Sequence, residues 1–219
     1  MKNLLKEYIQ LVLKEAAASP VGYALQIGPD NRLTLWDPNA LLALVKKHAD
    51  EGMYPALLDK VDEWVVGTIL LGREEKEDHW GGREVMNSAA RKGFGPTMYD
   101  LAMYQFGCPL FSDRDSVSPS AENVWDFYMK KRSDIKRLPF DDIENPKTPS
   151  REDDAEVYPE NRPALNAAYN GTGINTTPML NKHKFAVKLI ADELGWESER
   201  IQKLVSNAGR EFFQIKYEG

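Results

Sequence analysis

The spacing of apolar residues predicts helices near both ends of the chain. Over residues 2–18 the apolar side chains recur every three or four residues, the period of an amphipathic helix, and Ser19-Pro20 would end it. Its apolar face would hold Leu4, Leu5, Tyr8, Ile9, Val12 and Leu13. A second helix is expected to begin at Pro38 and to stop at Gly52.

Between these helices the pattern favours short strands. "GYALQIG" and "RLTLWD" read as two strands joined by a Pro-Asp-Asn turn. Three later runs suit strands of a central sheet: "DEWVVGTILLGRE", "REVMNSAA" and the buried type "CPLF". The polar run "EKEDHWGG" should be a loop. Helices are expected over residues 97–106 and 121–132, so strands and helices alternate as in an α/β fold.

The composition changes near residue 138. Residues 138–163 are rich in proline and acidic residues, which predicts an extended connection. Residues 164–219 return to a helical pattern in two pieces, and Ser198 would cap the second. The domain plan is therefore a helix over 1–19, an α/β domain over 20–137, the connection, and a C-terminal helical extension. Such a tail should pack on the domain, because two helices alone bury too little surface.

Charge and composition exclude several classes of function. The chain has 219 residues and a formal net charge of −6, so no general binding to nucleic acid or to an anionic membrane surface is expected. It has a single cysteine, Cys108, and its start does not have the pattern of a secretory signal, which together favour a cytoplasmic location. No metal site is expected, since His48 and His183 have no partner at ligand spacing.

The Gly-rich turn "ARKGFG", residues 90–95, is the strongest candidate for chemistry. A strand followed by a glycine turn and a helix exposes backbone N–H groups at the positive end of the helix dipole, which suits a phosphate. Arg91 and Lys92 would add positive charge. The alternative is a bare turn whose glycines serve packing alone, and Pro96 fits a plain helix start equally well.

The order of elements and two motifs resemble the GNAT superfamily of acyl-CoA N-acyltransferases. "ARKGFG" aligns with the run that binds the pyrophosphate of acyl-CoA in that superfamily, and "SPSAENVW", residues 118–125, aligns with its Asn-x-x-Ala-x-x-x-Tyr run. The similarity covers roughly residues 60–135. It implies a GNAT-like mixed central sheet flanked by helices, with acetyl-CoA or another acyl-CoA as co-substrate and no metal.

The resemblance implies roles for particular residues. The cofactor-binding residues would be Arg91, Lys92, Gly93, Phe94, Gly95 and Thr97. Glu84 is the candidate base for the amine. Trp125 stands where such enzymes carry the tyrosine that protonates the CoA thiolate, and an indole cannot do this, so Tyr128 is the candidate proton donor.

The N-terminal segment resembles the short leader helices of proteins packaged in the heads of T-even-type tailed phages. Leu13-Lys14-Glu15 fits the triplet after which such leaders are cut; a plain helix docked on the core is the alternative. The implied location is the cytoplasm of a phage host, or the virion. A second hypothesis follows: a non-catalytic virion protein that retains the fold and contacts other capsid or virion subunits. The acidic segment 141–160 could instead bind a host protein.

Overall fold

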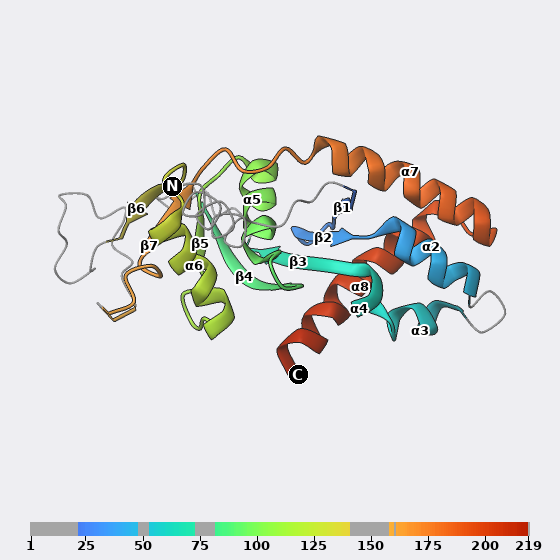
Figure 1. The fold of residues 1–219 in the computed structure, drawn as a ribbon, viewed down its shortest axis with the longest axis horizontal. Coiled ribbons are helices and arrows are strands. Elements are labelled where there is room, and N and C mark those ends of the chain that lie inside the picture. Colours follow the sequence, from blue (N-terminus) through green and yellow to red (C-terminus); the bar gives the residue numbers. More distant parts are fainter. Residues whose placement is uncertain (1–21, 48–52, 73–81, 141–157, 160, 219) are drawn as a thin grey trace, which may run out of the picture.

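The computed structural model describes residues 22–47, 53–72, 82–140, 158–159 and 161–218. Within them the chain forms one seven-stranded mixed sheet of order β1-β2-β3-β4-β5-β7-β6, flanked by helices (Figure 1). The α/β class predicted from the sequence is confirmed. The predicted N-terminal helix, Gly52, His48, the loop with His79 and Trp80, and most of the acidic connection lie outside the described residues.

The first half of the sheet is antiparallel. β1 (Ala24–Ile27) and β2 (Arg32–Trp36) form the predicted hairpin, and Asn31 in its turn has a φ of 62°, which asparagine tolerates. β3 (Val65–Leu71) pairs with β2 on one side and with β4 (Arg83–Ala90) on the other. All seven β3 residues are apolar, small or threonine, as expected for a strand covered on both faces.

The second half of the sheet is mixed: of the strand pairs in the described residues, one is parallel, and it lies here. β5 (Leu110–Ser112) runs parallel to β4, and α5 (Gly95–Phe106) makes the crossover between them. β7 (Ala167–Asn170) and β6 (Lys136–Pro139) complete the sheet as an antiparallel pair beyond β5. α6 (Pro119–Lys131) forms close to its expected range and begins two residues earlier, with the Ser118 hydroxyl accepting from the Ala121 N–H.

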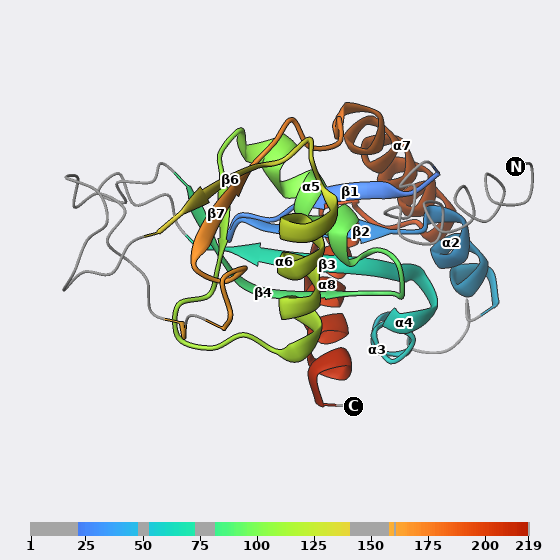
Figure 2. The same ribbon diagram turned by 60° about the vertical axis from the view of Figure 1, so that its left-hand side comes forward.

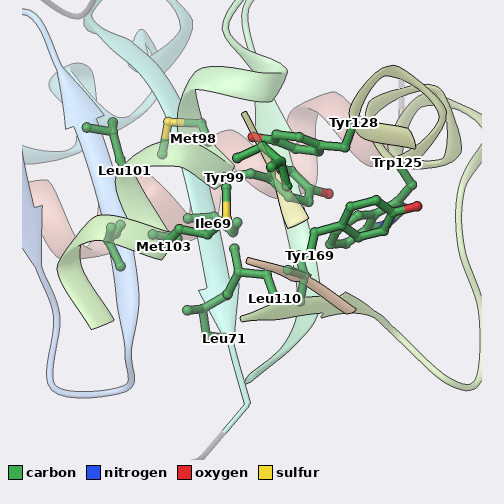
Figure 3. Close-up of a cluster of buried hydrophobic side chains, with 14 of the residues drawn as sticks. Ile69, Leu71, Met98, Tyr99, Leu101, Met103, Leu110, Trp125, Tyr128 and Tyr169 are labelled. Carbon is green, nitrogen blue, oxygen red and sulfur yellow. The ribbon is translucent and has the colours of Figure 1, made fainter. Parts of the chain in front are cut away.

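Helices cover both faces of the sheet. α5 lies on one face and α8 (Ser198–Glu218) on the other, and α6 lies beside α5 (Figures 1 and 2). α7 (Thr177–Leu194) packs along β1 at the sheet edge, next to α2 (Pro38–Lys47). The α5 side buries a cluster of Leu, Ile, Met and aromatic residues (Figure 3). On the α8 side, Trp36 and Trp64 pack edge to face, with ring centroids 6.2 Å apart.

The C-terminal region differs from its prediction in two respects. Residues 167–170 form β7, a strand inside the sheet, where a helix was expected. α7 and α8 do form, and they pack on the sheet as expected. However, the apolar residues of α7 do not all lie on one buried face: Phe185 and Leu189 are 70% and 44% exposed, whereas Val187 and Ile190 are buried.

Two short helices precede β3 where no helix was predicted. They are α3 (Met53–Leu58) and α4 (Val61–Trp64). Residues 62–64 therefore do not belong to the strand. The Trp64 indole N–H donates to the Leu57 carbonyl at 3.0 Å, which ties the two helices together and leaves Val65 as the first residue of β3.

Candidate ligand cleft beside strand β4

β5 ends before β4 does, which leaves the later part of one edge of β4 open. Their parallel pairing covers only Arg83 to Val85, whereas β4 continues to pair with β3 as far as Ala90. The β3 register shifts so that Leu70 pairs with Asn87 and Leu71 with Val85, which leaves Met86 as a bulge residue. A bulge bends its strand locally, and β5 itself ends at Ser112, so β4 has no β5 partner from Met86 onward.

Two adjoining cavities occupy the opening. The first has a volume of about 330 Å³ and extends from Ser88 on β4 to Gly95 at the start of α5. The second, of about 410 Å³, reaches from Ser88 to Asp113 in the loop after β5. They share the side chains of Ser88, Tyr99, Ser118, Ala121 and Phe213. We call the combined space the β4 cleft, and its volume falls within the range usual for small-molecule sites.

The Gly-rich turn ends at one end of the β4 cleft. Gly93 has a φ of 87°, so a side chain would be strained there, and Phe94 caps α5. A Cβ on Gly95 would lie 3.1 Å from Cγ2 of Val124 on α6, and both residues line the first cavity. The first N–H groups of a helix have no intrahelical acceptor, so the backbone at Gly95 can donate to a ligand in that cavity.

The other predicted cofactor residues point elsewhere or are buried. The Arg91 guanidinium donates to the Asp62 carbonyl on α4 at 2.8 Å, and its backbone N–H donates to Val66. Lys92 is exposed, and Phe94 packs edge to face on Tyr23, with centroids 5.4 Å apart. Thr97 is fully buried. Of the six residues predicted to bind the cofactor, Gly95 is the one that lines the described cavities.

Tyr99 lies at the centre of the β4 cleft, which the sequence did not indicate. Its hydroxyl is 3.0 Å from the Ser88 hydroxyl, and the residue lines both cavities. Burial raises the pKa of Tyr99 to about 12, so the phenol keeps its proton at neutral pH. The ring packs edge to face on Trp125, with centroids 4.9 Å apart, and the rest of the aromatic cluster includes Tyr128 and Tyr169 (Figure 3).

Tyr128, the predicted proton donor, belongs to a buried polar network. Its hydroxyl lies 2.7 Å from Oδ1 of Asp100 and 2.9 Å from the Pro96 carbonyl. Arg132 completes the network with an N–H···O contact of 2.8 Å to Oδ2 of Asp100. Burial, and then the neighbouring Asp100, raise the pKa of Tyr128 well above its usual value. This phenol is held by two acceptors, whereas Tyr99 borders the cavity.

Glu84, the predicted base, lies next to the Asp113 end of the β4 cleft. Its Oε1 accepts from the backbone N–H of Arg114 at 2.7 Å, and the lining of the second cavity begins one residue later, at Val85. Burial raises the pKa of Glu84, and the hydrogen bond from Arg114 opposes this. The Arg114 guanidinium stands 5.3 Å from the centre of the Tyr158 ring and donates to the Leu165 carbonyl.

The loop 113–118 is held by hydrogen bonds within the loop, and it also borders the β4 cleft. Oδ1 of Asp113 accepts from the N–H groups of Asp115 and Ser116, at 2.8 and 3.0 Å. Ser116 and Ser118 line the second cavity beside Asp113. Oδ1 of Asn87 is buried in the same wall with no protein donor in the described structure. This end of the cleft is therefore rich in hydrogen-bond acceptors.

Neither a metal centre nor a membrane span is found in the described ranges. These residues contain no group of three His, Cys, Asp or Glu side chains able to hold an ion. His183 is buried against Trp36, with ring centroids 5.8 Å apart. None of the helices within the described ranges combines the length and the apolar character needed to cross a bilayer.

The function is inferred from the fold and the β4 cleft, because no protein-family model, no curated protein and no solved structure matches the chain.

Proposed function

We propose that the chain is an acyl-CoA-dependent N-acyltransferase of GNAT-like type whose β4 cleft binds the acyl-CoA. The observation that carries the proposal is the pair of cavities beside β4 beyond the end of β5, with the Gly95 backbone at one end and Tyr99 lining both. The diphosphate would lie against the first turn of α5. From Met86 onward β4 has no β5 partner, so its backbone can bind the amide groups of the pantetheine arm.

In the proposed reaction, the nitrogen of an unprotonated amine attacks the thioester carbon, and the carbon–sulfur bond breaks. The thiolate takes a proton from a phenol, and the proton released by the amine passes to water or to Glu84. Tyr99 is better placed than Tyr128 to be the donor, because Tyr99 lines both cavities, whereas the Tyr128 hydroxyl is held by Asp100 and the Pro96 carbonyl. Glu84 would act through a water molecule, since its Oε1 is already held by the Arg114 N–H.

A thermal-shift titration tests the proposal. Acetyl-CoA in large excess over its Kd should raise the Tm by several degrees, because a ligand that binds only the folded state stabilises it by about 2.7 kcal/mol at a hundredfold excess. ATP at equal concentration serves as the control and should shift the Tm less. Release of free CoA thiol in the presence of a panel of amines then identifies the acceptor. No shift with acetyl-CoA at millimolar concentration would contradict the proposal.

A second candidate function, a non-catalytic virion protein with the same fold, is favoured by Trp125. This residue stands at the family's tyrosine position and is 1% exposed inside the aromatic cluster, so the usual proton donor is replaced by packing. Mass spectrometry of purified phage particles tests this candidate: the chain should be present in stoichiometric amount. Its absence from particles, combined with acyl transfer in solution, would leave the enzyme as the better reading.

A further inference from the structure

The last turns of α8 reach the β4 cleft. Phe213 lines both cavities, and Lys216 lines the first cavity together with Gly95. The sequence predicted this helix but gave it only a packing role. Figure 1 shows α8, in red, crossing the sheet on the side opposite α5 and extending beyond it at its C-terminal end.

The position of these two side chains is fixed by the buried face of α8. Leu204, Val205, Ala208 and Phe212 are all fully buried against the sheet. Phe213 follows the last of them, and Lys216 lies one turn further along. The ammonium of Lys216 also lies 5.5 Å from the centre of the Phe212 ring, a distance at which a cation is attracted to the ring face.

The first cavity holds one cationic side chain among its described lining residues, and that residue is Lys216. Arg91, the cation expected from the sequence, is engaged by the Asp62 carbonyl, 2.8 Å away on α4. Lys216 is exposed, so its charge remains hydrated until a ligand arrives, and its flexible stem allows the ammonium to follow a phosphate. The rest of the lining combines apolar side chains, Met98, Val124 and Phe213 among them, with the hydroxyls of Ser88, Ser118 and Ser120.

We propose that α8 forms part of the ligand site, with Lys216 as the cation that binds the phosphate groups of the ligand and Phe213 as its apolar cover. The inference rests on the proposed function and adds to it the residues that select an anionic, phosphate-bearing ligand. An anion at the Gly95 end of the cleft would meet backbone N–H groups on one side and the Lys216 ammonium on the other.

Calorimetric titration with CoA tests this assignment, using the full-length chain and matched charge reversals on one helix. Lys216→Glu should weaken CoA binding about tenfold, the effect expected for replacing an exposed attraction by a repulsion. Lys203→Glu makes the same charge change at an exposed α8 position outside the cavity lining and should alter the Kd less than about twofold. Both sites are exposed, so both variants should keep the wild-type Tm.

Salt dependence separates the role of the charge from that of the ring. The Kd of the wild type should rise with NaCl concentration more steeply than that of Lys216→Glu, because the lysine attraction is screened. Phe213→Ala should weaken CoA binding while retaining the wild-type salt slope. Equal affinities of Lys216→Glu and Lys203→Glu, with CoA bound by the wild type, would overturn this inference and leave the proposed function intact. Absence of CoA binding by the wild type would overturn both.

Discussion

The hydroxyl oxygens of Tyr99 and Ser88 lie 3.0 Å apart and join α5 to β4 at the point where the two cavities meet. Burial raises the pKa of Tyr99 to about 12, so the phenol is protonated at neutral pH, and its proton transfer to a thiolate of usual pKa about 8.5 is uphill unless the phenolate is reprotonated as it forms. Ser88 holds the phenol in place from the neighbouring strand. The pair therefore links the fold to the proposed chemistry.

Tyr99→Phe should abolish most acyl transfer without abolishing acetyl-CoA binding. Loss of a general acid lowers turnover by about 10²- to 10⁴-fold, whereas the phenyl ring still fills the same space. Steady-state kinetics gives kcat, and calorimetry gives the Kd, which should change less than about threefold. Tyr128→Phe is the matched comparison: it should retain kcat within about tenfold. If Tyr128→Phe were the variant with the larger loss of kcat, the donor assigned from the sequence would be correct instead.

Arg132→Ala should destabilise the fold strongly. The Arg132 guanidinium contacts Oδ2 of Asp100 at 2.8 Å, and the Asp100 side chain is only 4% exposed, so the substitution leaves a carboxylate without its counter-charge. Breaking such a pair costs about 3–5 kcal/mol when it is fully buried, and we expect about 2–4 kcal/mol here because Arg132 is partly exposed. Urea denaturation measures the free energy of unfolding.

A surface ion pair supplies the control for this experiment. Lys130 and Asp126 lie 2.6 Å apart on the exposed side of α6, and their side chains are 57% and 38% exposed. Lys130→Ala should change the free energy of unfolding by no more than about 0.5 kcal/mol. Similar losses in the two variants would show that the Asp100 network contributes no more than a surface contact.

His183 should make the fold less stable as the solution becomes acidic. Burial lowers its pKa from 6.5 to about 4, so the unfolded chain binds a proton between these values while the folded chain does not. Stability from the neutral imidazole is complete above about pH 6.5 and is lost as the pH falls toward 4, by roughly 2–4 kcal/mol in total. Denaturation from pH 7 to pH 4 measures the loss.

His183→Gln removes the titrating group and should flatten that part of the profile. The difference between the wild type and the variant isolates His183 from the carboxylates that titrate over the same range. A wild-type slope that persists unchanged in the variant would assign the acid sensitivity to carboxylates whose pKa is lowered in the fold, such as Asp134 beside Arg132.

Local patterns predicted the sheet better than the site. The hairpin β1–β2 and strands β3 and β4 were foreseen, because their turn residues and apolar runs are local signals. β7 was missed, since Ala167-Ala168-Tyr169-Asn170 is short and has no β-branched residue; its strand state depends on pairing with β5 and β6. Gly95 was found because the Gly-rich run between a strand and a helix is a local signal in the sequence.

The remaining site residues depend on contacts between distant segments. Tyr99 reads as a core aromatic in the sequence, and its place beside Ser88 depends on how α5 packs on β4. Phe213 and Lys216 enter the cleft from a helix that begins more than a hundred residues after the Gly-rich turn. Arg91 was chosen for its charge and its position next to the turn, and the Asp62 carbonyl that engages it lies on α4, a helix that the pattern did not predict.

Ligand binding in the β4 cleft is tested most directly by filling it. Ala121 lines both cavities from the first turn of α6, so Ala121→Trp should occupy the space with an indole; Asn123→Trp, at an exposed position of the same helix, is the matched control. In calorimetric titrations with acetyl-CoA, we expect binding by the wild type and by Asn123→Trp, and none by a folded Ala121→Trp. Equal binding by all three proteins would place the ligand elsewhere and contradict the account.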